Sequence, residues 1–468
     1  MVKIGLEIHR QIESHKLFCK CPSQLQESTS DIKVKRFLRA VTSETGEKDL
    51  VAEYEMAKQK YAEYEAYEDT TCLVELDESP PEPLNEEALK AVLEVALLLH
   101  CDIVDELIIM RKQVLDFSNT SGFQRTVLVA RNGYVEVKGE KIRINTLCLE
   151  EDAARKIKEE KDYVVYRLDR LGIPLIEITT KPDITNAQEA KEVASYLGMI
   201  LKSTGKFKAG IGTIRQDVNI SVEGGARVEI KGVQDLRSMD KVVELEIMRQ
   251  QQILKDKGKV REEVRNVQED NTTLYLRPMP GAARMYVETD VPSFKITQEF
   301  LKGIKKPVLL TEKIERVEEK YHLHAEIARA LVQEDYLELF EELHAKFHMP
   351  DLIAKTLVLT TKDLKSRLNL PSERLKKKDF EEVFGYVQKG LIDKDAVDHV
   401  LADKLEGRFD LKKYEKINEK DLEFYIKNII KEKNELSDGA LMGIIMKEYQ
   451  GKVNGKKVME ILKKIRGD

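Results

Sequence analysis

Hydrophobic and polar residues alternate along several short stretches in the N-terminal part of the chain. Residues 2–8 (VKIGLEI) form one such stretch, and similar runs occupy 163–168, 174–178, 219–222 and 227–230. Alternation with a period of two is typical of a strand that buries one face and exposes the other. The pattern therefore predicts half-buried β-strands at these five places.

Helical stretches lie between the predicted strands. Asn85 can cap a helix that begins with two glutamates, and Asn186 can cap a second helix over 187–201. An asparagine in this position accepts hydrogen bonds from the open amide groups of the first helical turn. Because strands and helices do not alternate regularly, we expect an α+β fold rich in antiparallel pairing, rather than a doubly wound parallel sheet.

The pattern changes after about Pro292, where apolar residues recur at helical spacing among many lysines and glutamates. The chain has 468 residues, which leaves room for about three domains at ~150 residues each. We expect an antiparallel-rich α+β domain over 1–294, an all-α domain over 295–407 and a small helical tail domain over 408–468. The second boundary is placed near Gly407, where a helix is expected to end and a lysine-rich stretch begins.

Charge is unevenly distributed along the chain. The 78 Lys and Arg residues against 84 Asp and Glu give a net charge of −6, which argues against a bulk nucleic-acid binder. The segment 439–468, however, has seven basic and three acidic residues and hence a net charge of +4. This tail and the basic clusters at 365–367 and 374–378 are candidates for contact with nucleic-acid phosphates. A solvated lysine-rich helix face is the alternative interpretation of each cluster.

Several classes of protein are excluded by composition. Five cysteines are too few, and odd in number, for a disulfide framework, and they indicate a reducing compartment. The most apolar helical stretch, 88–99, contains Lys90 and Glu94 and is shorter than the ~20 residues of a membrane span. Residues 1–7 lack a signal-peptide pattern. We therefore expect a cytoplasmic protein that does not enter a membrane.

Acidic side chains stand among apolar residues in three segments, at Glu7 with His9, at Glu150 with Glu151, and at Glu177. Glu7 and His9 are two residues apart on a predicted strand and therefore point to the same face. Buried carboxylates are costly unless they are paired, protonated or bound to a metal. Several carboxylates suit Mg²⁺, which implies a phosphate substrate, although the chain has no glycine-rich loop of the G-x-x-x-x-G-K-[ST] type. The alternative is that each carboxylate lies in water at a strand edge.

Two other polar groups are candidates for a binding site. Arg215, Asp217 and Asn219 recur with a period of two, so they share one strand face, and a solvated outer face is the alternative. Lys112 lies shortly before the polar turn 118–125 (SNTSGFQR). The backbone of that turn can present donors to a phosphate or a ribose.

The cysteines offer a possible metal site. Cys19 and Cys21 form a C-x-C pair, and Cys72 can supply a third ligand with Asp69 as a fourth. Structural zinc takes four such ligands. The alternative is that the paired cysteines are simply buried beside a turn. We expect Cys148 in the hydrophobic core because its neighbours are apolar.

Longer motifs follow one another in order along the whole chain. They are 5–9 (GLEIH), 16–21 (KLFCKC), 69–72 (DTTC), 120–125 (TSGFQR), 149–154 (LEEDAA), 170–177 (RLGIPLIE), 212–219 (GTIRQDVN), 227–231 (RVEIK), 277–285 (RPMPGAARM), 439–447 (GALMGIIMK) and 455–458 (GKKV). Together they resemble the B/E subunits of tRNA-dependent amidotransferases. The residues of these motifs resemble the archaeal E subunit of glutamyl-tRNA(Gln) amidotransferase more closely than the bacterial B subunit.

The resemblance implies a glutamine-dependent carbon–nitrogen ligase with a two-step reaction. The E subunit uses ATP and Mg²⁺ to phosphorylate the γ-carboxylate of glutamate mischarged on tRNA(Gln), and ammonia then displaces the phosphate. Ammonia reaches it through an internal channel from an asparaginase-like glutaminase, the D subunit, in a heterotetramer of two D and two E subunits. The resemblance assigns catalysis to a cradle domain over 1–294 and tRNA binding to the helical region and tail.

Individual residues match the family's functional positions. The positions tied to Mg²⁺ and the active site are His9, Glu150 or Glu151, and Glu177. Other positions of the catalytic cradle match Glu7 and Lys112, and the nucleotide positions match Arg215, Asp217 and Asn219. Because adjacent residues of a strand point to opposite faces, we expect only one of Glu150 and Glu151 to bind the metal.

The chain departs from the E-subunit pattern in three places. An inserted domain resembling part of bacterial aspartyl-tRNA synthetases is expected between 263–267 and 275–278, where only 268–274 lies. Phe117 stands where the family tends to have glycine, and Asp69 replaces a cysteine of the bacterial C-x-x-C pair. Two alternatives therefore stay open. One is a B-type subunit with an amidase partner that acts on aspartyl- or glutamyl-tRNA, and the other is a non-catalytic tRNA-binding scaffold.

Overall fold

The structure is a computed structural model of the chain. It describes residues 1–37, 56–57, 59–114, 116–210, 212–279, 285–334, 336–415, 419–433, 436–449, 453 and 455–466. Part of the motif 277–285, and Lys452 and Asp468 of the basic tail, lie outside the described residues. The chain forms two compact units, Met1–Leu309 and Leu310–Asp468. The finer division at residues 294 and 407 stays a prediction.

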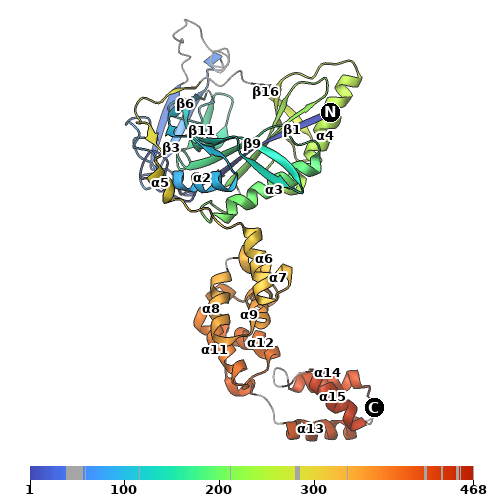
Figure 1. The fold of residues 1–468 in the computed structure, drawn as a ribbon. Helices are drawn as coiled ribbons and strands as arrows, with labels where there is room; N and C mark the ends of the chain where they lie inside the picture. The colour runs from blue at the N-terminus through green and yellow to red at the C-terminus, as the bar shows by residue number, and fades with distance from the viewer. Residues whose placement is uncertain are drawn as a thin grey trace. The chain divides into compact units, whose positions relative to one another are not determined.

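The first unit is built on a large sheet, and the α+β fold predicted from the sequence is confirmed (Figure 1). Its strands are β1 (Val2–Gln11), β4 (Asp102–Ile103), β6 (Ile109–Gln113), β7 (Phe123–Arg131), β8 (Tyr134–Val137), β9 (Glu140–Glu151), β12 (Pro174–Thr180), β13 (Ile214–Val222), β14 (Val228–Lys231), β15 (Glu263–Val267), β16 (Thr273–Pro278) and β17 (Met285–Val287). The main order is β16-β15-β14-β13-β1-β12-β9-β7-β6-β17, with β4 beside β7 and β8 beside β9. Among these described strands only β14 and β15 pair in parallel, as expected for an antiparallel-rich sheet.

The two edge strands of this sheet are neighbours in sequence. β16 ends at Pro278 and β17 begins at Met285, yet they lie at opposite ends of the strand order. Seven links between consecutive Cα atoms span at most about 25 Å. The sheet therefore curves strongly enough to bring its first and last strands within that distance. Five residues, 268–272, join β15 to β16 at the place where the inserted domain of the family was expected.

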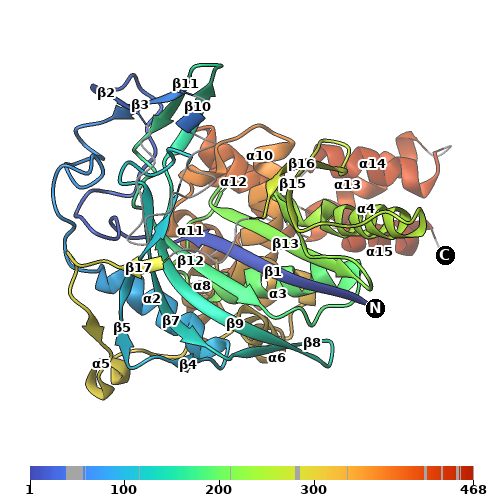
Figure 2. The ribbon, with the colours of Figure 1, turned by 90° about the horizontal axis from the view of Figure 1, so that it is seen from above.

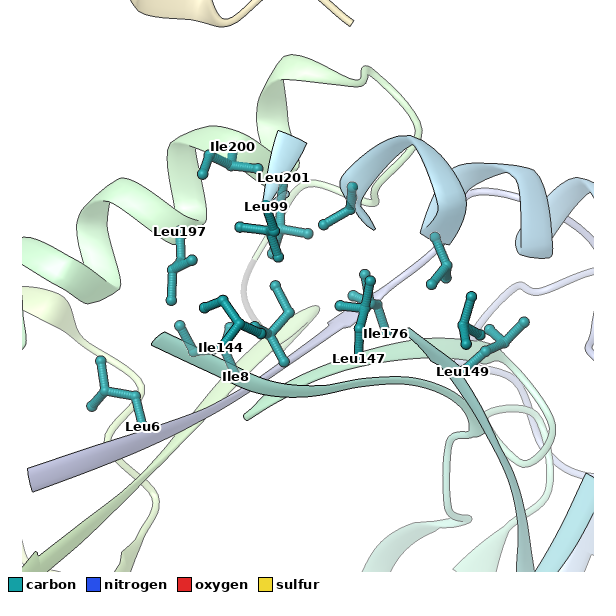
Figure 3. Close-up of a cluster of buried hydrophobic side chains, with 14 of the residues drawn as sticks. Leu6, Ile8, Leu99, Ile144, Leu147, Leu149, Ile176, Leu197, Ile200 and Leu201 are labelled. Atoms are coloured by element: carbon teal, nitrogen blue, oxygen red, sulfur yellow. The ribbon is translucent and has the colours of Figure 1, made fainter. Parts of the chain in front are cut away.

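Three helices cover one face of the sheet (Figure 1). They are α2 (Glu86–Leu98), α3 (Ala187–Ser203) and α4 (Leu236–Lys255). Asn85 and Asn186 accept hydrogen bonds from first-turn amides of α2 and α3, as predicted. In Figure 3, Leu6, Ile8 and Ile176 from the strands face Leu197 and Leu201 of α3. Burial of these side chains stabilises the unit. The residues that alternate with them along the strands point to the other face of the sheet.

A second, four-stranded sheet lies in the same unit (Figure 2). Its strands, in spatial order, are β10 (Arg155–Glu159), β11 (Tyr163–Arg167), β3 (Tyr61–Ala66) and β2 (Ile32–Phe37). One face packs on a small core that includes Tyr64, Tyr166 and Leu168. Two short strands, β5 (Glu106–Leu107) and β18 (Phe294–Lys295), pair separately, and the helix α5 (Gln298–Lys302) follows.

The second unit is helical, as the spacing of apolar residues predicts. Its α-helices are α6 (Leu310–Tyr321), α7 (Ala325–Gln333), α8 (Leu337–Phe347), α9 (Pro350–Lys355), α10 (Thr361–Ser366), α11 (Lys377–Gln388), α12 (Val397–Leu405), α13 (Glu419–Glu432), α14 (Asp438–Glu448) and α15 (Gly455–Arg466). They form two hydrophobic clusters, one within 317–414 and one within 422–462. Within the described part of the chain, no helix has the length and apolar character that a membrane span requires.

Candidate functional site

The candidate site lies on the polar face of the large sheet, opposite the helices. On β1, Ile4, Leu6 and Ile8 enter the core. Glu7 and His9 alternate with these residues and therefore point to the other face. Strand pairing places Glu177 of β12 directly opposite His9 on one side. On the other side Asp217 of β13 stands opposite Glu7, and Arg215 opposite His9. Side chains from segments more than 160 residues apart in sequence thus meet on one surface.

A compact acidic cluster occupies the centre of this face. His9 Nε2 lies 3.2 Å from a Glu177 carboxylate oxygen, 3.5 Å from Glu7 and 4.0 Å from Glu150. Lys112 Nζ, from β6, is 3.3 Å from Glu150 and 3.6 Å from Glu177. One potential ligand atom each from Glu7, His9 and Glu177 lies within 4.8 Å of the other two. The structure therefore brings together five of the residues predicted for the catalytic cradle.

The cluster holds its protons unequally. Burial and the neighbouring Glu177 carboxylate raise the pKa of Glu7 to about 7. Burial also opposes the charge of Glu177, but the hydrogen bond with His9 and the charge of Lys112 lower its pKa to about 2. Burial lowers the pKa of the His9 imidazole, but the hydrogen bond with Glu177 and the charges of Glu177 and Glu7 raise it by more, so the net shift is upward. A divalent cation that entered the cluster would displace protons from Glu7 and His9.

Glu150 and Glu151 point to opposite sides, as the strand geometry predicts. Glu150 is buried and faces His9 and Lys112. Glu151 accepts hydrogen bonds from the backbone amide and the guanidinium of Arg125, whose Nε also donates to Glu288. Of the two, Glu150 alone belongs to the acidic cluster, and Glu151 belongs to a buried ion-pair network.

The three residues predicted for the nucleotide share the face of β13 with the cluster. Arg215 donates to Asp152 at 2.6 Å, and Asp217 accepts from Lys231 Nζ at 2.7 Å. Asn219 is half-buried and stands opposite Gly5. Burial would lower the pKa of Lys231, but the charges of Asp217 and Glu229 raise it. This end of the face therefore carries a cation that balances its carboxylates.

The cysteine motif folds into a second cluster of possible metal ligands. Potential ligand atoms of Cys19, Cys21, Cys72 and Glu75 lie within 4.8 Å of one another. The prediction of Asp69 as the fourth ligand is wrong, because its carboxylate accepts from Gln26 and Glu75 lies with the cysteines. Hydrogen bonds from the other two thiols strongly lower the pKa of Cys72. Three thiols and one carboxylate match the number and kind of ligands that zinc takes.

Sequence reasoning missed the residues that orient the acidic cluster. Thr126 Oγ1 donates to Glu150 at 2.6 Å, and Gln124 Nε2 donates to the other Glu150 oxygen at 3.2 Å. Thr179 Oγ1 donates to Glu177 at 3.3 Å. Period-two spacing along β7 and β12 could have found them, since Thr179 is two residues from Glu177. Cys148, expected in the core, is half-buried on the polar face because it stands opposite Glu177.

A curved antiparallel sheet with a carboxylate-rich face, followed by a helical unit, defines an α+β protein of two units. The protein-family model of the GatB/GatE catalytic domain matches residues 2–302, and the family model of a GatB domain matches residues 338–465. The chain belongs to the GatB/GatE family.

Curated relatives extend this match over nearly the whole chain. A Methanocaldococcus jannaschii protein is 37% identical over 99% of this chain and 98% of its own length. Proteins of Archaeoglobus fulgidus and Methanosarcina acetivorans are 36% and 35% identical over 99% of this chain and 97% of theirs. All three relatives are named as the E subunit of glutamyl-tRNA(Gln) amidotransferase.

The alignments are much longer than the chain. The M. jannaschii alignment runs over 617 positions, whereas the chain has 468 residues, so at least 149 positions have no residue in this chain. This agrees with the absence of an inserted domain. The short turn between β15 and β16 lies where that absence was predicted.

Proposed function

We propose that the chain is the kinase and amidating subunit of a glutamyl-tRNA(Gln) amidotransferase, a carbon–nitrogen ligase. An oxygen of the γ-carboxylate of Glu-tRNA(Gln) attacks the γ-phosphorus of ATP, and ADP leaves. Ammonia then attacks the activated carbonyl carbon, the phosphate leaves with the bonding electrons, and Gln-tRNA(Gln) results. A carboxylate is a poor acceptor for ammonia until phosphorylation supplies a leaving group.

The observation that carries this proposal is the acidic cluster on the polar face of the large sheet. A substrate carboxylate and a triphosphate are both anionic, so they can approach this face only if positive charge balances Glu7, Glu150 and Glu177. The donor set of two carboxylates and one imidazole, with a raised pKa at Glu7, fits a divalent cation. The predicted ligands were His9, Glu177 and one of Glu150 and Glu151, whereas the potential ligand atoms that lie together are those of Glu7, His9 and Glu177. Mg²⁺ held by these three would neutralise charge on the transferring phosphoryl group.

The chain's own residues supply the remaining charge and orientation. Although burial disfavours its charge, Lys112 has a raised pKa because of Glu150 and Glu177, so it stays protonated and can donate to a phosphoryl oxygen. Thr126 and Gln124 fix the Glu150 carboxylate in one orientation. We assign the nucleotide to the adjoining face of Arg215, Asp217 and Asn219, where Lys231 supplies a further cation.

The partners follow from the family and from charge. We propose that an asparaginase-like glutaminase, a D subunit, supplies the ammonia in a complex of two D and two E subunits. The basic segment 439–468 and the helical unit are the proposed contacts for tRNA(Gln). A B-type subunit with an amidase partner remains the alternative within the family, and purification of the chain with its natural partner distinguishes the two.

We also propose that Cys19, Cys21, Cys72 and Glu75 hold a structural zinc ion. The four side chains come from two segments, 19–21 and 72–75, that lie outside the helices and strands. A shared ion would hold these two segments together. Glu75 accepts from the Cys19 thiol and lies 3.6 Å from Lys16 Nζ.

The decisive experiment is an amidation assay with Glu-tRNA(Gln), ATP and ammonium chloride in the absence of any partner. We expect Gln-tRNA(Gln) and ADP from the wild-type chain. His9→Ala should form neither product while binding tRNA normally. Lys138→Gln, on the exposed turn between β8 and β9, is the matched control and should keep full activity. If the wild-type chain binds tRNA without forming ADP, the chain is a scaffold and the proposal is wrong.

A further inference from the structure

Three aromatic side chains form a row across the outer face of the four-stranded sheet. Phe37 of β2 stands opposite Tyr61 of β3, and Tyr61 stands beside Tyr163 of β11. The ring centroids are 5.7 Å apart in the first pair and 5.5 Å apart in the second. The second pair is stacked, with 16° between the ring planes. We call Phe37, Tyr61 and Tyr163 the aromatic row.

The aromatic row is not part of the core of this sheet. The buried face carries Tyr64 and Tyr166, which belong to the small hydrophobic cluster. Since side chains alternate along a strand, Tyr61 and Tyr163, each three residues earlier, stand on the opposite face. Phe37 is 63% exposed. The ring pairs across the strands contribute to the stability of the sheet, yet Phe37 leaves most of its surface exposed to solvent.

Lysines accompany the rings. Lys35 Nζ lies 3.5 Å from the centroid of the Tyr61 ring and 5.2 Å from that of Phe37. Lys158 Nζ donates to the Tyr163 hydroxyl at 3.1 Å. The same face also carries Lys33 and Arg167, which pair with Glu63 and Glu65, and Lys35 lies among the rings. Stacking rings beside lysines are the combination by which proteins bind unpaired nucleotides.

The position of the sheet in the chain connects it to the acidic cluster. β10 and β11 form an excursion between β9, which carries Glu150, and β12, which carries Glu177. The excursion is anchored by Arg155, which pairs with the buried Asp169 at 2.7 Å. One strand of the aromatic row, β11, is therefore joined directly in sequence to β12, which carries Glu177.

We propose that the outer face of the four-stranded sheet binds unpaired nucleotides of RNA, and that its ligand is the single-stranded 3′ end of the aminoacyl-tRNA. A base stacks on the exposed Phe37 ring, and Lys35, which lies 5.2 Å from the centroid of that ring, contacts the adjoining phosphate. The identity of the RNA rests on the proposed function, whereas the binding of unpaired nucleotides rests on the sheet alone. This surface holds the substrate's end while its glutamyl group is at the acidic cluster.

The test uses the full chain and a short single-stranded RNA that carries 2-aminopurine, whose fluorescence is quenched when it stacks. Wild-type protein should quench the fluorescence, and Phe37→Ala should weaken binding about tenfold and lose most of the quenching. Phe37→Trp should retain both. Lys35→Gln should weaken binding and reduce the dependence of log Kd on log salt by about 1. In the amidation assay, Phe37→Ala should raise KM for Glu-tRNA and leave kcat unchanged.

Two variants control for exposure and charge. Met248→Ala removes a 60% exposed apolar side chain on α4, and Lys138→Gln removes a 73% exposed lysine side chain, so both should bind RNA like the wild type. Equal RNA binding and equal quenching by Phe37→Ala and the wild type would overturn the inference. Blunt duplex RNA that bound the wild type as tightly as the single strand would also overturn it, as would a surface that bound a protein partner and no RNA. If the wild type binds the RNA but forms no amidated product, the proposed function fails and this surface stands.

Discussion

Glu177 makes the most demanding test of the acidic cluster. Glu177→Gln keeps the size of the side chain but removes the charge that His9 and Lys112 contact. Among the groups that raise the pKa of His9, Glu177 acts most strongly, through its hydrogen bond and its charge. The pKa of His9 should therefore fall in this variant. We expect kcat for amidation to fall more than about 100-fold, since even residues that only orient a metal ligand contribute 10- to 100-fold.

Two measurements on the same variant test the reasoning. Amidation with ammonium chloride gives kcat, and nuclear magnetic resonance of labelled histidine gives the His9 pKa, assigned by comparison with His9→Ala. Thr179→Val is the matched control because it removes one hydrogen bond to Glu177 and leaves the charge. It should lower kcat less than about tenfold. A Glu177→Gln enzyme with normal kcat, or with an unchanged His9 pKa, would refute the assignment of this cluster as the active site.

Four further predictions concern Glu7, the cysteine cluster, the helical unit and the basic tail. The pKa of Glu7 is about 7 in the folded chain against 4.5 as its ordinary value, so without divalent cations stability should fall by up to about 3 kcal/mol as the pH rises from 4.5 to 7. Glu7→Gln should abolish this fall in urea unfolding with EDTA. Purified protein should contain zinc by atomic emission, and Cys72→Ser should lose it whereas Cys148→Ser should not. Asp403→Ala removes the buried acceptor of Lys413 and Tyr414 and should destabilise the helical unit by about 1–3 kcal/mol in urea. A chain truncated after Gly407 should bind tRNA more weakly by filter binding, and unchanged affinity would remove the tail from the tRNA site.

Local features of the fold were predictable from the sequence. The alternation over 2–8 predicted both β1 and the face on which Glu7 and His9 lie, because strand geometry alone determines it. Asn85 and Asn186 predicted the starts of α2 and α3 because a cap acts within one helical turn. The strand order was not predictable. β1 pairs with β12 and β13, which follow more than 160 residues later, and periodicity carries no information about such partners.

The same limit applies to the candidate site. The sequence predicted that only one of Glu150 and Glu151 belongs to the site, but it did not say which. Selecting Glu150 required the strand register that places Thr126 beside it. Glu75 was missed as a possible metal ligand because it lies in a turn region, where no period relates one side chain to another. The aromatic row was missed for a third reason, since Phe37, Tyr61 and Tyr163 align only through pairing between three separate strands.

The link between the edge strands has a mechanical consequence. Pro278 at the end of β16 and Met285 at the start of β17 stay within about 25 Å of each other whatever the state of the molecule, because the chain between them can stretch no further. Covalent length therefore limits how far the two edge strands can move apart. The strands that carry Glu7, Glu177 and Lys112 lie between these edges, so the same limit applies to the face that holds the acidic cluster.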